Sequence, residues 1–375
     1  MISLHQLLKT MIEQGASDLH LTTGSPPQIR IDGGLRPLDL PPLTPPEGKR
    51  LCYSVLTEAQ KHRFEEENEL DLSFGVKDLS RFRANIFMQR GSVAGAFRAI
   101  PFKIFTFEEL GLPLVVNDIA NKPRGLVLVT GPTGSGKTTT LYSTLKQLAT
   151  EEVNVCSVED PIEMVEPAFN QMQVQQNIDL TFSDGIRTLL RQDPDIIMVG
   201  EIRDGETAEM ATQAALTGHL VLSTLHTNDA PSSITRLLDL DVPFYLINST
   251  VIGIMAQRLV RTLCPHCKEA TDIDQATWDA LVSPWKIAKP NQIQKAVGCL
   301  ECRMTGYRGR SGIYEMLTIS PAIKKLIAQN ADLAAIRATA HREGMVPLMI
   351  NGAEKVAAGI TTIEELLKVA PSPLD

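Results

Sequence analysis

Residues 131–140 read GPTGSGKTTT and directly follow the apolar run GLVLVT at 125–130. The segment fits the phosphate-loop pattern Gly-x-x-x-x-Gly-Lys-Thr in full, and the stretch after it, TTTLYSTLKQLAT, is typical of a helix. In such a loop successive backbone amides face an anion, and the amino end of the following helix points at the phosphates. A chance glycine-rich turn is the alternative, but the strand before the loop and the helix after it argue against a chance match. The sequence therefore predicts a site for a nucleoside triphosphate.

The chemistry of such a loop assigns roles to its residues. Lys137 supplies positive charge to the β- and γ-phosphates of ATP, and the Thr138 hydroxyl is a ligand for Mg²⁺. The other residues surround the phosphates with backbone amides and hydroxyls. The expected nucleotide-binding residues of the loop are Gly131, Pro132, Thr133, Gly134, Ser135, Gly136, Lys137, Thr138 and Thr139.

The chain after residue 119 alternates apolar strands with helical segments. Continuous apolar runs lie at 126–130, 154–158, 196–200 and 219–225. This pattern is typical of a parallel sheet that is buried on both faces, so we expect an α/β fold.

Carboxylates follow two of these runs. Glu201 ends the run DPDIIMVGE and should reach the carboxyl edge of the sheet, where ligands bind. We expect it to hold Mg²⁺ or position water, although a solvated glutamate at a strand end is the alternative. The cluster SVEDPIE follows another run, and one of Glu159, Asp160 and Glu163 is expected to polarise the attacking water.

Two histidines flank the strand LVLSTL. His219 and His226 are seven residues apart, so they point to opposite faces unless one of them lies in the loop beyond the strand. A lone histidine more often packs or caps than binds a ligand. The loop that begins at His226 is the better candidate for sensing a γ-phosphate.

Composition limits the remaining possibilities. The chain has 375 residues, 43% of them hydrophobic, which is enough for two domains. A net charge of −8 without a lysine-arginine block argues against nucleic-acid binding. No run approaches the ~18 apolar residues that would span a bilayer. We therefore expect a cytoplasmic protein that meets a membrane only through partners.

The segment before the phosphate loop has a different pattern of predicted secondary structure. Residues 1–103 begin with an amphipathic helix and continue with short strands and turns, as a compact α/β domain would. Residues 104–118 contain a Leu-Pro break and are interpreted as a hinge. Residues 119–375 would form the nucleotide-binding domain.

Four of the six cysteines form two Cys-x-x-Cys pairs, separated by 31 residues. In a chain without a secretion signal this spacing indicates a structural zinc site with four thiolate ligands, on an insertion at about 262–304. Unliganded buried thiols and a late disulfide are the alternatives. The expected ligands are Cys264, Cys267, Cys299 and Cys302.

The segments GPTGSGKTTT, SVEDPIE, DPDIIMVGEIRD and TGHLVLSTLHTND together resemble the four nucleotide-site boxes of the type II and type IV secretion and pilus motor ATPases. The resemblance implies a hexameric ring with a PAS-like N-terminal domain and a RecA-like ATPase domain, placed beneath an inner-membrane platform protein. It implies that Glu163 activates water, that Glu201 lies near Mg²⁺, and that His219 and His226 form the histidine box.

The predicted strand SRFRANIFMQR contains further candidate residues for the nucleotide site. Arg81 and Arg83 share one face by period two, and Arg98 lies on the returning strand. Spacing alone predicts a solvated face. The resemblance implies instead that arginines of this hairpin act on the γ-phosphate, so that hydrolysis would release one domain from the other.

The two halves of the chain resemble different branches of the family. ASDLHLTTGSPPQIRIDGGLRPL and SRFRANIFMQRG resemble pilus retraction ATPases, whereas the cysteine insertion and TGYRGRSGIYEML resemble assembly and secretion ATPases. We expect a retraction motor for twitching motility, with assembly or secretion as the alternative and a second motor ATPase as a further partner. A P-loop phosphotransferase and a nucleic-acid translocase are the competing hypotheses from other classes.

Overall fold

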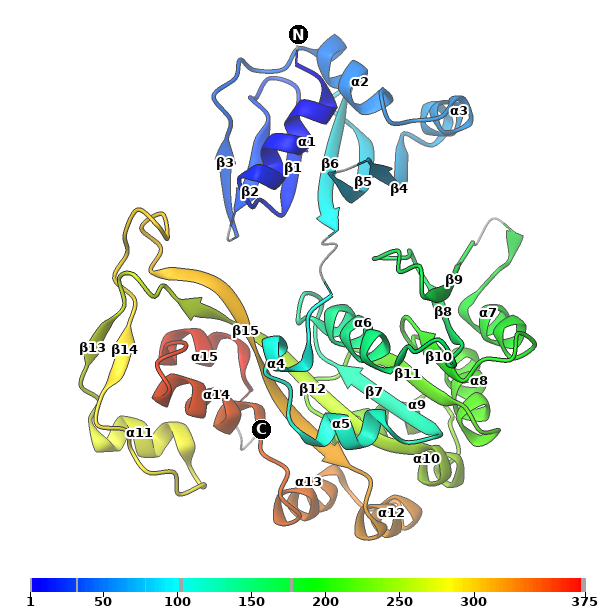
Figure 1. The fold of residues 1–375 in the computed structure, drawn as a ribbon, viewed down its shortest axis with the longest axis vertical. Coiled ribbons are helices and arrows are strands. Elements are labelled where there is room, and N and C mark those ends of the chain that lie inside the picture. Colours follow the sequence, from blue (N-terminus) through cyan, green and yellow to red (C-terminus); the bar gives the residue numbers. More distant parts are fainter. Residues whose placement is uncertain (1, 32, 78, 101–103, 176–177, 372–375) are drawn as a thin grey trace. The chain divides into compact units, whose positions relative to one another are not determined.

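The computed structural model describes residues 2–371 except 32, 78, 101–103 and 176–177. It divides the chain into two compact units, Met1–Lys103 and Ile104–Asp375. Each unit has a hydrophobic core of its own, and Figure 1 shows the elements of both. Residues 101–103, at the division, lie outside the described residues.

The first unit is built on a six-stranded antiparallel sheet with the order β3-β2-β1-β6-β5-β4. Successive side chains of a strand point to opposite faces of the sheet. On β5, Phe82, Ala84 and Ile86 are therefore buried in the core, while Arg83 is exposed on the other face. The strands are β1 (Asp18–Leu21), β2 (Gln28–Ile31), β3 (Gly34–Pro37), β4 (Glu69–Val76), β5 (Ser80–Gln89) and β6 (Ser92–Ile100).

Helices complete this unit. The first, α1 (Leu4–Glu13), begins at a capping box formed by Ser3 and Gln6 and buries one apolar side. The charged stretch that follows the first strands forms two helices, α2 (Pro45–Tyr53) and α3 (Glu58–Glu67). The helix α3 begins at a capping box of its own, formed by Thr57 and Gln60.

The second unit contains a seven-stranded mixed sheet with the order β15-β12-β7-β11-β10-β8-β9. The strands β7, β8, β10 and β11 are buried along their whole length and run parallel, as the apolar runs predict. The strands are β7 (Gly125–Thr130), β8 (Val155–Glu159), β9 (Phe169–Gln173), β10 (Ile196–Val199), β11 (Leu220–Leu225), β12 (Val251–Leu263) and β15 (Tyr307–Thr318).

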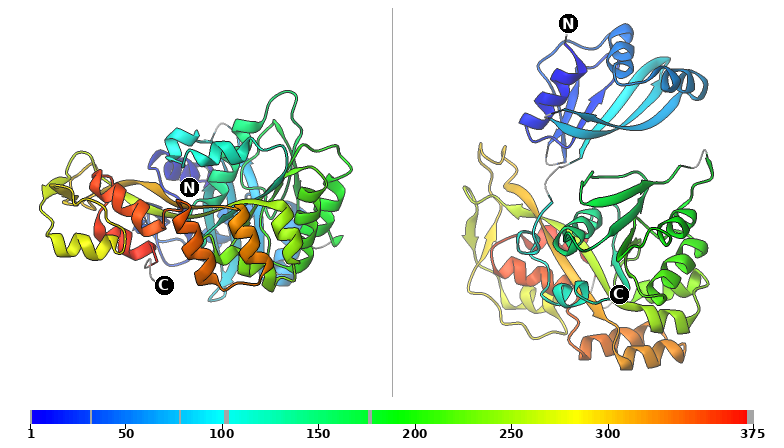
Figure 2. Two further views of the ribbon diagram at one scale, coloured as in Figure 1. Left: turned by 90° about the horizontal axis from the view of Figure 1, so that it is seen from below. Right: turned by 45° about the vertical axis from the view of Figure 1, so that its right-hand side comes forward.

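Helices cover both faces of this sheet, as Figure 2 shows from two further directions. The short helices α4 (Phe107–Leu110) and α5 (Val115–Ala120) belong to this unit, so residues 104–118 are part of its fold. Their action as a hinge stays a prediction. The other helices of the sheet are α6 (Lys137–Leu148), α7 (Phe182–Leu189), α8 (Gly205–Leu216), α9 (Ser232–Asp239), α10 (Phe244–Thr250), α12 (Pro321–Ala328), α13 (Leu333–Arg342), α14 (Leu348–Ala357) and α15 (Ile363–Val369).

The long antiparallel pair β12 and β15 was not predicted. These strands pair from Gly253 with Thr318 to Leu263 with Tyr307, and the cysteine segment lies between their ends. That segment contains β13 (Glu269–Thr271), α11 (Gln275–Val282) and β14 (Ile293–Lys295). Across the described ranges, no helix has both the length and the apolar character needed to cross a membrane.

Candidate nucleotide-binding site

Four of the predicted segments follow strands that are neighbours in the second sheet. The phosphate loop follows β7, His226 follows β11, Glu201 follows β10, and residues 160–163 follow β8. These strands are ordered β7-β11-β10-β8 and run parallel. Their carboxyl ends therefore meet at one edge, where open α/β sheets bind ligands.

The phosphate loop has the backbone that an anion site needs. Gly134 and Gly136 have φ values of +80° and +90°, in the region that favours glycine. A Cβ atom at Gly131 would lie 2.5 Å from the backbone oxygen of Gln257, so the loop packs tightly on β12. The buried Ser135 hydroxyl has no hydrogen-bond partner among the described residues, which fits a phosphate oxygen as its partner.

The other loop residues are open to a ligand. Pro132, Thr133 and Thr138 are exposed, and Thr139 is half-buried. Since α6 begins at Lys137, Thr138 lies in its first turn, where the free amides and the helix dipole favour an anion.

Lys137 is already aimed into the loop. Its Nζ donates hydrogen bonds to the backbone oxygens of Gly131 (2.7 Å) and Pro132 (3.1 Å). Burial lowers the pKa of Lys137 to about 8, Glu201 opposes this shift, and Arg258 adds to it. A triphosphate would give the ammonium group an anionic partner and favour its charged form.

Glu201 and His226 are brought together at the edge of the sheet. His226 Nε2 lies 3.4 Å from Glu201 Oε2, and Arg203 donates a hydrogen bond to the other oxygen of this carboxylate. Burial acts to raise the pKa of Glu201, but the hydrogen bond and charge of Arg203, together with His226, hold it below its usual value. Glu201 is therefore ionised, as a residue that helps to hold Mg²⁺ must be.

The residues of the acidic cluster lie in different environments. Glu159 is buried and accepts hydrogen bonds from Tyr142 (2.6 Å), Ser157 (2.7 Å) and Gln171 (3.1 Å). Burial raises the pKa of Glu159, and these three hydrogen bonds, with a smaller contribution from a backbone hydrogen bond of Glu163, oppose the shift. Glu159 is thus a residue that shapes the loop after β8, whereas the side chain of Glu163 is partly accessible to solvent.

His219 lies at the opposite edge of the sheet. It precedes β11, and its backbone oxygen accepts a hydrogen bond from Gly125 at the start of β7. Its Nδ1 atom lies 2.9 Å from the backbone oxygen of Ala214. Within this chain the structure does not bring His219 to the phosphate loop, and its contacts are those of the packing or capping alternative.

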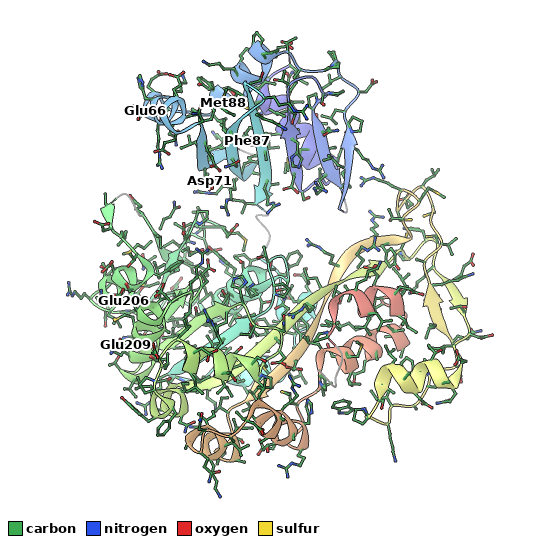
Figure 3. All side chains as sticks on the ribbon, turned by 180° about the vertical axis from the view of Figure 1, so that it is seen from behind. Glu66, Asp71, Phe87, Met88, Glu206 and Glu209 are labelled. Carbon is green, nitrogen blue, oxygen red and sulfur yellow. The ribbon has the colours of Figure 1, made fainter. Side chains whose placement is uncertain are left out.

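The three arginines lie on the polar face of the first unit's sheet. Arg83 and Arg98 are directly opposite each other across β5 and β6. Arg98 Nε is 2.8 Å from Asp18, and Arg83 is 3.9 Å from Asp71, which Figure 3 labels on β4. The Nε of Arg81, on the same face, is buried without a hydrogen-bond partner among the described residues. Their contact with a γ-phosphate stays a prediction.

Sequence reasoning missed two residues of β12 that lie beneath the loop. Gln257 accepts a hydrogen bond from Thr140 (2.8 Å), and the buried Arg258 donates one to the backbone oxygen of Asn228 (2.7 Å). The available signal was a Gln-Arg pair inside the apolar run VIGIMAQRLV, since buried charges in a strand require a partner.

The four cysteines of the insertion converge on one point. Their sulfur atoms all lie within 4.8 Å of one another, with Cys264 and Cys299 3.9 Å apart and Cys267 and Cys302 3.7 Å apart. A tetrahedron with Zn–S bonds of about 2.3 Å has S–S edges of about 3.8 Å. A disulfide would hold its sulfurs at about 2.05 Å, so the separations fit a metal ion and not a disulfide.

The sheet and its edge define a P-loop nucleotide-binding protein of the α/β class. A family described as "Type II/IV secretion system protein" matches residues 1–368. Type IV pilus assembly ATPase TfpB of Acinetobacter baylyi is 47% identical over 392 residues, covering 97% of this chain and 64% of that relative. Type II secretion system protein E of Pseudomonas aeruginosa is 39% identical over 378 residues, covering 98% and 74%.

A solved structure agrees with these relatives. The pilus retraction motor PilT with bound ADP has a TM-score of 0.79 and 36% identity, and the match covers 100% of this chain and 98% of that chain. The chain therefore belongs to the type II/IV secretion system protein family and is an ATPase of that family.

Proposed function

We propose that the chain is a motor subunit that hydrolyses ATP at the carboxyl edge of its second sheet and drives a type IV pilus. The observation that carries this proposal is the convergence of the phosphate loop, Glu201, His226 and residues 160–163 on four neighbouring parallel strands. Relatives named as pilus and secretion ATPases support it.

Each residue of this edge has a role in the proposal. Lys137 contacts the β- and γ-phosphates of ATP, while Thr138 and Glu201 hold Mg²⁺, which offsets phosphate charge when bound. Glu163 accepts a proton from the attacking water. His226 senses the γ-phosphate from the loop beside Glu201, since its ring lies 3.4 Å from that carboxylate.

The mechanical step uses the first unit. In the proposal this unit is PAS-like, the second unit is RecA-like, and six chains form a ring on the cytoplasmic side of the inner membrane. Arg83 and Arg98, with Arg81, contact the γ-phosphate, and hydrolysis removes their partner and frees the first unit. Around the ring this movement would act on a platform protein in the membrane, with a second motor ATPase driving the opposite movement.

A phosphotransferase would share the phosphate loop but needs an acceptor. We expect the purified protein to release phosphate from ATP and Mg²⁺ alone, because water is the nucleophile in a motor ATPase. Phosphate release can be followed with and without candidate small-molecule acceptors. Turnover that appears only after an acceptor is added would contradict the proposal.

The direction of the motor is the second part of the proposal. The first unit resembles retraction ATPases, and the likeness to PilT supports retraction for twitching motility. The cysteine cluster and the 47% identity to an assembly ATPase support assembly as the second candidate.

Deletion of the gene distinguishes these directions. Loss of a retraction motor should leave excess surface pili without twitching, whereas loss of an assembly motor should leave none. Electron microscopy of the cell surface and a twitching assay would measure both. Normal pili and twitching with blocked protein export would instead assign the motor to secretion and remove the pilus role.

We further propose that the four cysteines bind a structural zinc ion. Four thiolates fill a tetrahedral shell and leave no position for a substrate. The backbone amides of Gly298 and Gly306 donate to the sulfurs of Cys267 (3.3 Å) and Cys302 (3.1 Å), and such donors stabilise thiolates that hold a cation.

Replacement of Cys267 by serine should remove the zinc ion and lower the melting temperature, because the segment between β12 and β15 loses its cross-link. Elemental analysis should detect about one zinc ion per unsubstituted chain and almost none in the variant. The matched control is Cys156→Ala, which alters a buried free cysteine outside the cluster. Equal metal content in the three proteins would reject the zinc site.

A further inference from the structure

The loop that carries His226 has no regular structure, so side chains from other elements fix its shape. Thr227 donates a backbone hydrogen bond to the Thr130 hydroxyl at the end of β7 (2.8 Å). This contact ties the start of the loop to the strand that leads into the phosphate loop. Residues 228–230, further along, are held by side chains of β12, β15 and α13.

Three consecutive residues of this loop are each held by a different element. Arg258 of β12 donates to the backbone oxygen of Asn228 at 2.7 Å. Arg337 of α13 pairs with the carboxylate of Asp229 at 2.7 Å. Glu315 of β15 accepts a hydrogen bond from the backbone amide of Ala230 at 2.8 Å.

These groups form one cluster of charges, in which Arg258 and Glu315 are buried and Asp229 and Arg337 are half-buried. Glu315 lies opposite Ala256 in the strand register, so Glu315 and Arg258 are diagonal neighbours on one face of the β12–β15 pair. Both are only 6% exposed. Burial raises the pKa of Glu315 to about 7, and Asp229 contributes in the same direction. Burial also lowers the pKa of Arg258, against the charges of Glu315 and Asp229.

Stability alone does not account for such a cluster. Burying several charges costs desolvation energy, and well-packed apolar residues of the same size are often at least as stabilising. A buried polar network does hold its members in one arrangement. Here the network fixes the 226–230 loop. This matters for the chemistry because His226, at the start of the loop, lies 3.4 Å from Glu201.

We infer that Arg258, Glu315 and Arg337 are positioning residues for ATP hydrolysis, which fix the 226–230 loop so that His226 stays beside Glu201. The inference rests on the proposed role of His226. It gives the long β12–β15 pair and α13 a part in the reaction, although none of the three side chains belongs to a nucleotide-site segment. The conformation of the histidine loop is then set by the chain that follows the cysteine insertion.

A double-mutant cycle on the full-length chain tests the inference. Arg258→Met should lower kcat about 10-fold or more, and since the charge of Arg258 also acts on Lys137, the split between kcat and KM for ATP is read from Arg337→Met. Arg337→Met should also lower kcat. Because Arg337 is more exposed than Arg258, this variant can be measured even if Arg258→Met folds poorly. Arg258→Lys, which retains the charge, should recover part of the loss.

The His226→Ala background gives the deciding measurement. If Arg258 and Arg337 act through His226, their replacement in that background should change kcat less than about 2-fold. An equally large loss in both backgrounds, or an unchanged kcat in the single variants, would overturn the inference. An unchanged kcat for His226→Ala alone would overturn both the role of His226 and the inference.

The control is a second charge pair on the same strand, in which the carboxylate is buried and the arginine is half-buried. Arg261 of β12 donates to Glu365 of α15, which is 5% exposed, and neither side chain belongs to the 226–230 loop. Glu365→Gln should lower the melting temperature but leave kcat unchanged. If the proposed ATPase function were wrong, the unsubstituted protein would release no phosphate from ATP. That result differs from every outcome of the mutant cycle.

Discussion

Replacement of Lys137 by alanine should reduce ATP hydrolysis by the purified protein about 10²–10³-fold. The ammonium group is the one positive charge that the loop itself supplies, and its contacts with the Gly131 and Pro132 carbonyls already aim it at the phosphate position. Charge that develops on the transferred phosphoryl group would then lack its main counter-charge within the loop. Steady-state phosphate release at saturating ATP measures the effect.

The matched control for this variant is Lys146→Ala. Lys146 lies on the same helix, α6, and pairs with Glu166 at the surface (2.9 Å). Its removal should leave kcat unchanged, because exposed ion pairs contribute little. Lys137→Ala protein that folds normally and hydrolyses ATP at the original rate would refute the phosphate-loop site and the motor that depends on it.

Much of this site follows from local sequence because parallel strands have a simple rule. Apolar runs followed by GPTGSGKT, GEIRD and HTND predict strands whose carboxyl ends meet, and β7, β10 and β11 place these segments at one edge. The rule needs only the order of strands and motifs along the chain. It separates His226, after β11, from His219, before it.

Other features depend on contacts between distant residues. The pairing of β12 with β15 spans the whole cysteine insertion, and no local pattern in either strand records it. Arg258 and Glu315 look like interruptions of apolar runs until that pairing brings them together. Likewise, residue spacing alone does not distinguish the three carboxylates of the acidic cluster, and the family resemblance points to Glu163. The structure adds that Glu159 is buried against Tyr142, whereas Glu163 is partly accessible to solvent.

That distinction leads to a second large effect. Glu163→Gln should lower kcat roughly 10²–10⁴-fold, the range expected when a general base is lost. The amide keeps the shape of the side chain but cannot take a proton from water. ATP binding should remain, since Lys137 and the loop amides are unchanged. A fluorescent nucleotide analogue would measure binding, and phosphate release would measure turnover.

Two matched variants make the assignment specific. Glu159→Gln should reduce kcat only slightly, because Glu159 is buried and glutamine still accepts the hydrogen bond from Tyr142. Glu201→Gln should raise the Mg²⁺ concentration needed for half-maximal turnover, whereas Glu163→Gln should not, because only Glu201 is proposed to hold the metal ion. If Glu159→Gln were inactive and Glu163→Gln active, the base would be the buried carboxylate, and the loop after β8 would have to open before each turnover.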